Sequence, residues 1–162
     1  MTSAAASVVH LAGERGVTVA TAESLTGGLV TAALTAIPGS SAVVRGGIVA
    51  YASDVKTSLL AVPHDVVDVY GVVSGECARA MAVGVRGVLG ATVGVATTGV
   101  AGPGSQEGQP VGTVYVAVAG AEGVEVEELH LDGSRTDIRA ATVEAALQLT
   151  VRVLLREEPA VG

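Results

Sequence analysis

The stretch VTVATAESLTGGLVTAALTAI, residues 17–37, carries the signals that decide the fold. Its first six residues are small or β-branched and predict a buried strand. The next six, ESLTGG, interrupt that pattern, and residues 29–37 predict a helix that ends at Pro38 and Gly39. A buried strand that runs through a glycine-containing turn into a helix is typical of α/β folds.

The same alternation of strands and helices extends outward from this stretch to both ends of the chain. Further helices are predicted over residues 3–15, 53–60, 63–70 and 74–89 and from residue 134 onward. Further strands are predicted over residues 43–51, 91–98, 111–119 and 124–131. Only a short GAEG turn separates the last two strands, so a hairpin is expected there, with at least one antiparallel pair. The sequence therefore predicts a three-layer α/β/α sandwich with a five-stranded mixed sheet.

Several predicted helices begin at residues that favour an N-cap. Ser74 and Ser134 are expected to cap the helices that follow them, and Ser53 or Asp54 is expected to cap a short one. Cys77 falls on the apolar stripe of its helix, where a buried core position is the simplest interpretation.

The chain shows no internal repeat and no long linker, so residues 1–162 are expected to form a single domain. In the last predicted strand, Glu125 and Glu127 alternate with valines, which predicts that one face of the strand meets water. The tail EEPAVG, residues 157–162, is expected to be frayed.

Composition and charge exclude several classes of partner and site. A net charge of −7 opposes binding to nucleic-acid phosphates, which depends on clustered lysine and arginine, so no direct nucleic-acid partner is expected. One cysteine rules out an intrachain disulfide, and three widely separated histidines lack metal-ligand spacing, so no metal site is expected. No apolar run is long enough to span a membrane, and no signal peptide is recognisable, so we expect a soluble cytoplasmic protein.

Three segments follow predicted parallel strands and are the expected location of a ligand site. They are residues 23–28, 51–56 and 98–104. In open α/β sheets, ligands bind at the carboxyl ends of the strands, where such segments meet.

The first of these segments places Ser24 between a strand and a helix. A turn of this kind can direct backbone N–H groups and the positive end of the helix at an anion or at a developing oxyanion, with Ser24 in the position of a nucleophile. The alternative is that Ser24 and Thr26 only cap the helix, as short hydroxyl residues often do, and the spacing alone favours this structural role.

The second segment contains Lys56, which is the only lysine in the chain; the other eight basic residues are arginines. A serine nucleophile needs a base, and none of the three histidines lies in a strand-end segment. Lysine can act as that base if its pKa falls from about 10.4 towards neutrality, whereas arginine does not deprotonate in proteins. An exposed lysine without catalytic function is the alternative interpretation.

The third segment is rich in glycine and continues into the polar tip SQE, residues 105–107. Its backbone can approach a ligand closely. A glycine-rich loop together with a tyrosine and a lysine also suggests a short-chain dehydrogenase. That class is rejected because the glycines lead into a loop and a strand rather than a helix, no comparable nucleotide-binding loop opens the chain, and five residues separate Tyr51 from Lys56.

Arg135 and Arg139 lie one helical turn apart at the start of the last predicted helix. Arginines at this end oppose the helix dipole, which indicates either an anionic partner or ordinary ion pairs on the surface.

With these residues in view, the chain resembles the C-terminal domain of the competence/damage-inducible protein CinA, in a form without the larger N-terminal domain of longer members. The matching stretches are TAESLTGGL, PGSSAVVRGGIVAYASDVKTSLLAV, YGVVSGECARAMAVG, TTGVAGPG, PVGTVY and GSRTDIR. They occur in the order of the family and span most of residues 17–150.

The resemblance implies a nicotinamide-mononucleotide deamidase of the serine/lysine hydrolase type, a small-molecule nucleotide substrate, no cofactor, and a homo-oligomer, most often a dimer. The catalytic residues implied are Ser24 as nucleophile, Lys56 as general base and Tyr51 as the hydrogen-bonding partner of Lys56. The substrate-binding residues implied are Thr26, Gly27, Gly28, Thr98, Gly99, Ala101, Gly102 and Arg135. The family fold, a three-layer α/β/α domain with five strands, agrees with the prediction made from the residues.

Two positions depart from the family pattern. Leu25 replaces a common cysteine, and Gln109 replaces a common lysine before PVG, which puts the handling of a phosphate in doubt. The main hypothesis is an amidohydrolase that acts through an acyl-enzyme. The alternative is a nucleotide-binding regulatory module without turnover, linked to competence or DNA damage.

Overall fold

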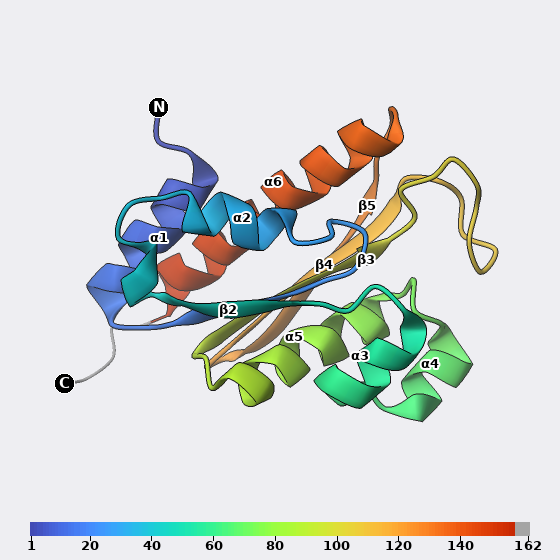
Figure 1. The fold of residues 1–162 in the computed structure, drawn as a ribbon, viewed down its shortest axis with the longest axis horizontal. Helices are drawn as coiled ribbons and strands as arrows, with labels where there is room; N and C mark the ends of the chain where they lie inside the picture. The colour runs from blue at the N-terminus through green and yellow to red at the C-terminus, as the bar shows by residue number, and fades with distance from the viewer. Residues whose placement is uncertain (158–162) are drawn as a thin grey trace.

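The computed structural model describes residues 1–157 and contains one mixed sheet with the order β2-β1-β3-β4-β5 (Figure 1). Its strands are β1 (Val19–Glu23), β2 (Val44–Val49), β3 (Val93–Gly99), β4 (Thr113–Gly120) and β5 (Gly123–His130). β1 is parallel to both β2 and β3, whereas β4 is antiparallel to β3 and to β5. The predicted mixed sheet and its terminal hairpin are confirmed. The tail predicted to be frayed lies, apart from its first residue, outside the described residues.

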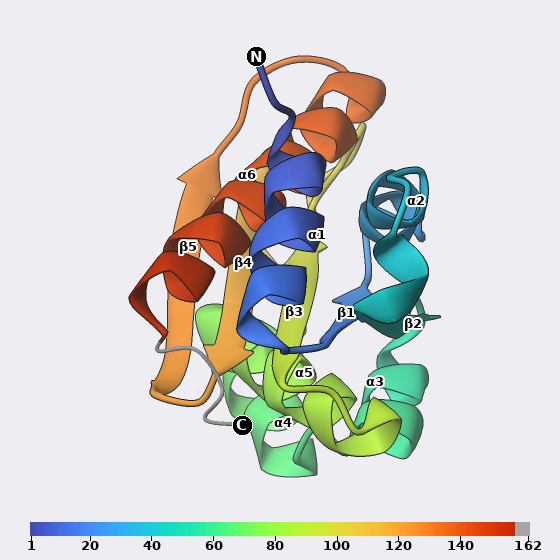
Figure 2. The ribbon, with the colours of Figure 1, turned by 90° about the vertical axis from the view of Figure 1, so that its left-hand side faces the viewer.

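Helices cover both faces of the sheet, as Figures 1 and 2 show. One face carries α1 (Ala4–Arg15), α2 (Leu29–Thr35) and α6 (Arg135–Arg156). The other carries α3 (Ser53–Leu60), α4 (His64–Tyr70) and α5 (Gly75–Leu89). This arrangement confirms the predicted α/β/α sandwich. Within residues 1–157, none of the helices has both the length and the apolar character that crossing a membrane requires.

The helix caps follow the sequence in two of the three predicted cases. Ser74 Oγ accepts the N–H of Cys77 at 3.1 Å, and Ser134 forms a capping box with Asp137. The cap predicted for α3 is wrong, because its N-cap position is Ala52, which has no capping side chain.

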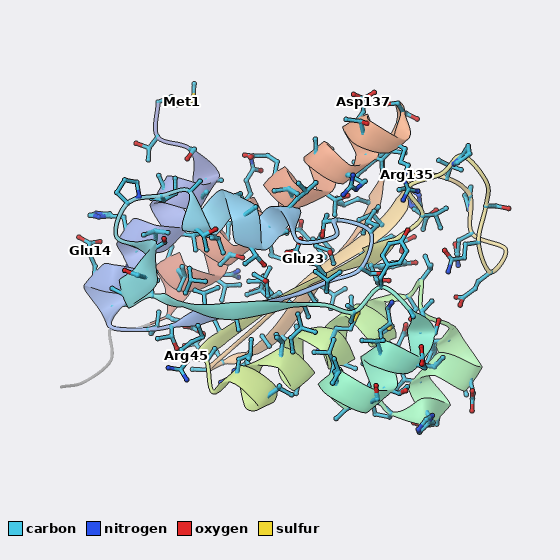
Figure 3. All side chains as sticks on the ribbon, viewed as in Figure 1. Met1, Glu14, Glu23, Arg45, Arg135 and Asp137 are labelled. Atoms are coloured by element: carbon cyan, nitrogen blue, oxygen red, sulfur yellow. The ribbon has the colours of Figure 1, made fainter. Side chains whose placement is uncertain are left out.

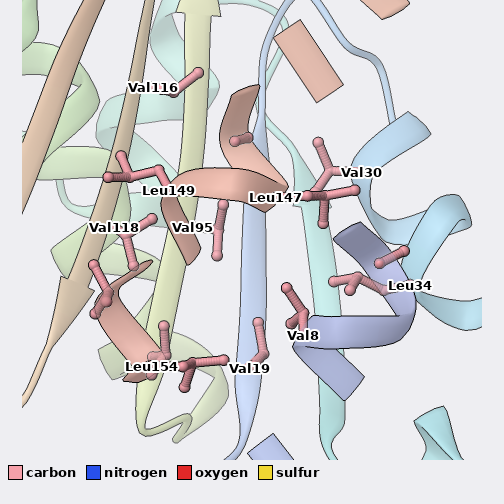
Figure 4. Packing of buried hydrophobic residues seen from close by; sticks show 14 of the residues in the cluster. Val8, Val19, Val30, Leu34, Val95, Val116, Val118, Leu147, Leu149 and Leu154 are labelled. Carbon is pink, nitrogen blue, oxygen red and sulfur yellow. The ribbon is translucent and has the colours of Figure 1, made fainter. Parts of the chain in front are cut away.

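The core lies on both sides of β1, which is buried along its whole length. Between the sheet and α1, α2 and α6, aliphatic side chains such as Val8, Leu34 and Leu147 interdigitate (Figure 4). On the other face, α5 packs closely because Gly94 of β3 has no side chain; a Cβ there would overlap the carbonyl of Ala82. Close packing of small residues thus replaces the aromatic residues that this core lacks.

The face of β5 that carries Glu125 and Glu127 meets water in part, as predicted. Their side chains are 43% and 37% exposed, and they form ion pairs with Arg156 and Arg152 of α6, respectively. The alternating pattern correctly separates the two faces of the strand, but a strand pattern alone does not show that a helix with matching charges covers the polar face.

Candidate active site

The carboxyl ends of the three parallel strands meet beside a pocket of about 280 Å³. Ser24 follows β1, Lys56 lies beyond the end of β2, and the glycine-rich loop follows β3. The pocket is lined by Ser24, Leu25, Tyr51, Lys56, Val72, Val73, Thr98, Gly99, Val100, Ala101, Gly102, Gly104, Ser105, Gln106 and Arg135. The strand-end rule therefore located the pocket correctly.

Ser24 is held by the backbone at the end of β1 and is only 9% exposed. Its N–H donates to the carbonyl of Thr97 in β3 at 3.0 Å, and its own carbonyl accepts the N–H of Gly27 at 3.0 Å. Neither Ser24 nor Thr26 caps α2, because the N-cap is Gly28 and no side chain bonds to the helix from that position. The structural interpretation of Ser24 as a helix cap is wrong.

The side chain of Glu23 occupies the start of α2, where an anionic ligand was expected from the sequence. Its buried carboxylate accepts the N–H of Val30 at 2.8 Å and both the N–H and the hydroxyl of Thr31, at 3.0 and 2.8 Å. A carboxylate at this end of a helix is favourable because it meets unpaired N–H groups and the positive end of the dipole. The expectation that these N–H groups face a ligand is therefore wrong.

Lys56 is the largest side chain buried to this extent in residues 1–157, with 1% of its surface exposed. Its Nζ lies 3.1 Å from Ser24 Oγ, and it donates to the carbonyl of Ala50 at 2.7 Å and to that of Tyr51 at 3.3 Å. The interpretation as an ordinary exposed lysine is excluded.

Burial lowers the pKa of Lys56, because removal from water disfavours the charged amine; negative charge on Cys77 or Glu107 acts in the opposite direction. Burial also raises the pKa of the Cys77 thiol to about 11, so this cysteine stays protonated near neutral pH. Cys77 is fully buried, as predicted.

The three contacts of Lys56 Nζ suit both protonation states of the amine. A protonated amine has three N–H groups, which match the two carbonyls and Ser24 Oγ. A neutral amine keeps two N–H groups for the carbonyls and directs its lone pair at Ser24 Oγ. A proton can therefore move between the serine and the lysine without rearrangement of the surrounding groups.

Tyr51 does not bond to Lys56 through its hydroxyl. Its side chain is 60% exposed, and the hydroxyl accepts a hydrogen bond from Arg135 at 3.1 Å. Only the backbone carbonyl of Tyr51 contacts Lys56. The hydrogen bond implied by the resemblance exists, but it comes from the backbone and not from the phenol.

The two arginines at the start of α6 have different partners. Arg135 reaches the loop after β3, where it donates to the carbonyl of Gly102 at 2.7 Å (Figure 3). Arg139 donates to the carbonyls of Leu25 and Thr26 at 2.9 and 3.3 Å and so supports the turn that carries Ser24. Within residues 1–157 neither forms an ion pair with a carboxylate, so the alternative of surface ion pairs is not supported.

The implied substrate-binding residues divide into two groups. Those that line the pocket are Thr98, Gly99, Ala101, Gly102 and Arg135. Thr26, Gly27 and Gly28 do not line it; Thr26 is buried and its hydroxyl bonds to that of Thr97 at 2.7 Å. Gly27 and Gly28 have φ angles of +57° and +103°, so their role in this structure is to form the turn after Ser24.

Several pocket residues were not identified from the sequence. Val72 and Val73 come from the linker between α4 and α5, which follows no strand and gave no signal. Ser105 and Gln106 belong to the polar tip of the glycine-rich loop, but no role was predicted for either. Gln109, at the departure from the family pattern, does not line the pocket. Among residues 1–157, no group of three or more potential metal-ligating side chains is close enough together to hold an ion.

Comparison with known proteins adds the family context. The model of a family described as the CinA C-terminal domain matches residues 1–154. A CinA-like protein of Frankia casuarinae is 50% identical over 147 residues, which cover 91% of this chain and 34% of that protein. A CinA-like protein of Gemmatimonas aurantiaca is 46% identical over 151 residues, covering 91% and 35% respectively. The chain thus spans about a third of the length of these relatives.

Solved structures of similar length have the same fold. The competence damage-inducible protein A of Klebsiella pneumoniae superposes with a TM-score of 0.92 at 31% identity, covering 96% of this chain and 97% of that one. The competence/damage-inducible protein CihA of Agrobacterium tumefaciens gives a TM-score of 0.85 at 38% identity, with 96% and 98% covered.

Proposed function

The chain belongs to the CinA C-terminal domain family, and we propose that it is an amidohydrolase that converts nicotinamide mononucleotide to nicotinate mononucleotide and ammonia. The observation that carries the proposal is the 3.1 Å contact between Lys56 Nζ and Ser24 Oγ at the buried end of the pocket. A regulatory module that only binds a nucleotide has no need for a buried amine in contact with a serine hydroxyl.

In the proposed reaction, neutral Lys56 removes the proton of Ser24 as Oγ attacks the carboxamide carbon. The C–N bond then breaks, and the Lys56 ammonium returns the proton to the departing nitrogen, which leaves as ammonia. Water attacks the acyl-enzyme while Lys56 accepts its proton; the bond between the acyl carbon and Ser24 Oγ then breaks, Lys56 returns that proton to Oγ, and the acid product loses its own proton to solvent and leaves as the carboxylate. The lowered pKa of Lys56 supports this role, because a base must be unprotonated at the operating pH.

Stabilisation of the oxyanion is assigned to backbone N–H groups that have no other acceptor. Those of Leu25 and Ala101 donate no hydrogen bond within residues 1–157, and both residues line the pocket. The N–H groups of Val30 and Thr31 are excluded because Glu23 already occupies them.

The phosphate of the substrate is assigned to the guanidinium of Arg135. This side chain is exposed and lines the pocket, and its present partners are a carbonyl and a phenol rather than a carboxylate. A charged phosphate is a stronger partner for arginine than either of these groups. A homodimer remains our expectation for the assembly.

The test is release of ammonia from nicotinamide mononucleotide by the purified protein, repeated with Lys56→Arg, whose guanidinium cannot deprotonate and therefore removes the base. We expect wild type to release ammonia and Lys56→Arg to bind the nucleotide, measured by calorimetry, without turnover. No ammonia from wild type would overturn the deamidase assignment and favour the binding module. Ammonia release at the wild-type rate by Lys56→Arg would overturn the lysine-base mechanism alone.

A further inference from the structure

The loop between β3 and β4 carries an acidic side chain, Glu107, that the proposed reaction does not use. Its Oε1 accepts the N–H of Val72 at 3.3 Å, and its Oε2 accepts the N–H of Val73 at 3.2 Å. Both valines line the pocket from the linker between α4 and α5, and Gln106, beside Glu107, lines it from the loop. One carboxylate thus joins two parts of the pocket wall that are more than thirty residues apart.

The backbone at Glu107 is unusual for this residue type. Its φ is +50°, and that of the following Gly108 is +75°. Gln106 and Gln109 bond to each other through their backbones on either side, at 3.1 and 2.8 Å. A two-residue turn with both central residues in the left-handed region favours Asn, Asp or Gly, and a longer side chain is disfavoured there by about 1 kcal/mol. Such a conformation persists where other contacts hold it, and the two N–H groups provide them.

The linker is shaped to receive this carboxylate. Gly71 has a φ of +79°, and a Cβ at this position would overlap Oε2 of Glu107. On its other side the linker is tied to the end of β3, because Thr98 Oγ1 donates to the carbonyl of Val72 at 2.7 Å. The Glu107 contacts therefore extend, through Val72, to a residue that lines the inner part of the pocket.

We propose that Glu107 is a positioning residue, whose carboxylate clamps the tip of the loop onto the 71–73 linker and so holds together the pocket wall that both segments form. The clamp itself does not depend on which reaction the site performs. Its effect on turnover rests on the proposed function: without the clamp, substrate is held less well, and KM rises more than kcat falls.

The charge of Glu107 also affects the pKa of Lys56, which a purely structural contact would not do. Negative charge on Glu107 raises the pKa of Lys56, and ionised Cys77 on α5 acts in the same sense. Arg135 of α6 lines the same pocket and has the opposite charge. Removal of the Glu107 charge therefore lowers the pKa of Lys56 further, provided that the loop stays near the linker.

Hydrogen exchange of the backbone amides tests the clamp in the intact chain without any substrate. In Glu107→Ala, the amides of Val72 and Val73 should exchange about tenfold faster than in wild type, because each loses a charged acceptor. Glu122→Ala, a glutamate in the β4–β5 turn that does not line this pocket, is the matched control and should leave them unchanged. Amides of β1 and β3 in the same spectra report whether the variant is folded. Unchanged exchange at both valines in a folded Glu107→Ala protein would overturn the clamp.

The charge effect is measured on the lysine itself. Because Lys56 is the only lysine, labelling with 13Cε-lysine gives a single NMR signal that needs no assignment. In Glu107→Gln the titration of this signal should shift to lower pH, whereas in Glu122→Gln it should stay at the wild-type position. An equal shift in both variants, or none in Glu107→Gln, contradicts the effect of the Glu107 charge on the pKa of Lys56. Both measurements keep their meaning even if the protein releases no ammonia from nicotinamide mononucleotide, so failure of the clamp and failure of the proposed function are distinguishable.

Discussion

The two sides of the pocket are built in different ways. The floor, which we define as the pocket residues Ser24, Leu25 and Lys56 together with their neighbours Glu23 and Thr26 outside the pocket, consists of buried residues, and its polar side chains bond to other buried or half-buried groups. The wall, which we define as residues 101–107 together with Arg135, is mostly exposed. Two side chains hold the loop of the wall in place. Glu107 accepts hydrogen bonds from the linker before α5, and Arg135, at the start of α6, donates to the carbonyl of Gly102.

This difference separates two tasks that one site must perform. A base and a nucleophile have to be held within a few tenths of an ångström, and buried hydrogen bonds at the ends of packed strands provide that precision. A substrate has to enter and leave, and an exposed loop held by a few surface contacts can open at low cost in free energy. We therefore expect changes in the floor to affect rate and stability, and changes in the wall to affect binding.

The largest effect is expected for Ser24→Ala in the floor. Under the proposed function, Ser24→Ala removes the nucleophile and should lower the rate of ammonia release by about a thousandfold or more, because no acyl-enzyme can form. The unfolding midpoint in urea should change little, since the alanine occupies the same space without the hydroxyl. A measurement of ammonia release and nucleotide binding on the same preparation checks this. Residual turnover above a tenth of the wild-type rate would show that another group is the nucleophile.

The next effect concerns the stability of the floor. Glu23→Ala leaves the N–H groups of Val30 and Thr31 and a threonine hydroxyl without their buried acceptor. We expect a loss of about 3 kcal/mol in the free energy of unfolding, and roughly half of that for Glu23→Gln, which keeps one acceptor oxygen. Urea unfolding of both variants measures this. Glu144→Ala, an exposed glutamate on α6, is the control and should cost less than about 0.5 kcal/mol. Equal stability of Glu23→Ala and wild type would contradict the structural role assigned to Glu23.

The floor was easier to predict from the sequence than the wall. A strand, a glycine turn and a helix in succession fix where Ser24 lies, and the rule that ligands bind at strand ends brought Lys56 to the same edge. Glu23 was missed because it was assigned to the turn as one of its interrupting residues. Its carboxylate turns back onto the helix that follows, which depends on side-chain direction and not on the periodicity of the chain.

The wall depends on contacts that no sequence pattern encodes. The positive φ of Glu107 is unexpected for a glutamate, and its partners lie in a linker that follows a helix rather than a strand. Tyr51 shows the same limit, because the resemblance implied a hydrogen bond between this residue and Lys56 but not that the carbonyl of Tyr51, rather than its hydroxyl, accepts it. Proximity of segments follows from topology, whereas the choice of contacting atom follows from packing.

In the wall, Arg135→Ala should raise KM about tenfold with a smaller change in kcat, because it removes the proposed partner of the substrate phosphate and a contact to Gly102. The free energy of unfolding should fall by less than about 0.5 kcal/mol, since the side chain is exposed. Arg45→Ala is the matched control: its guanidinium also donates to a backbone carbonyl, that of Leu89, at the opposite end of β2 (Figure 3). If Arg135→Ala lowers kcat and leaves KM at the wild-type value, the side chain belongs functionally to the floor.

The smallest effect is the pH dependence that Lys56 gives to stability, and its sign follows from linkage. Burial lowers the pKa of Lys56 in the folded protein below its value in the unfolded chain. Between these two pKa values the unfolded chain binds more protons, so the free energy of unfolding rises with pH, by at most about 1.4 kcal/mol per pH unit for one group. Below the folded-state pKa the cost of burying the charge is fully present. Cys77 has the opposite effect, because its pKa in the folded protein is raised to about 11. It lowers the free energy of unfolding as the pH rises, but mainly above about pH 9.

Urea unfolding of wild type and Lys56→Met between pH 6 and 8.5 isolates this contribution, because the onset of Cys77 titration in the unfolded chain near the upper end of this range is common to both proteins and cancels in the difference. We expect the difference in unfolding free energy between the two proteins to change with pH, with wild type gaining on the variant as pH rises. Lys56→Met also removes donors from the carbonyls of Ala50 and Tyr51, but that loss does not vary with pH and only offsets the two curves. Parallel curves over this range, together with a 13Cε-lysine titration near the ordinary value, would show that the floor holds a fully charged lysine. A charged amine cannot serve as a base, so the division between a catalytic floor and a substrate-binding wall would then be wrong.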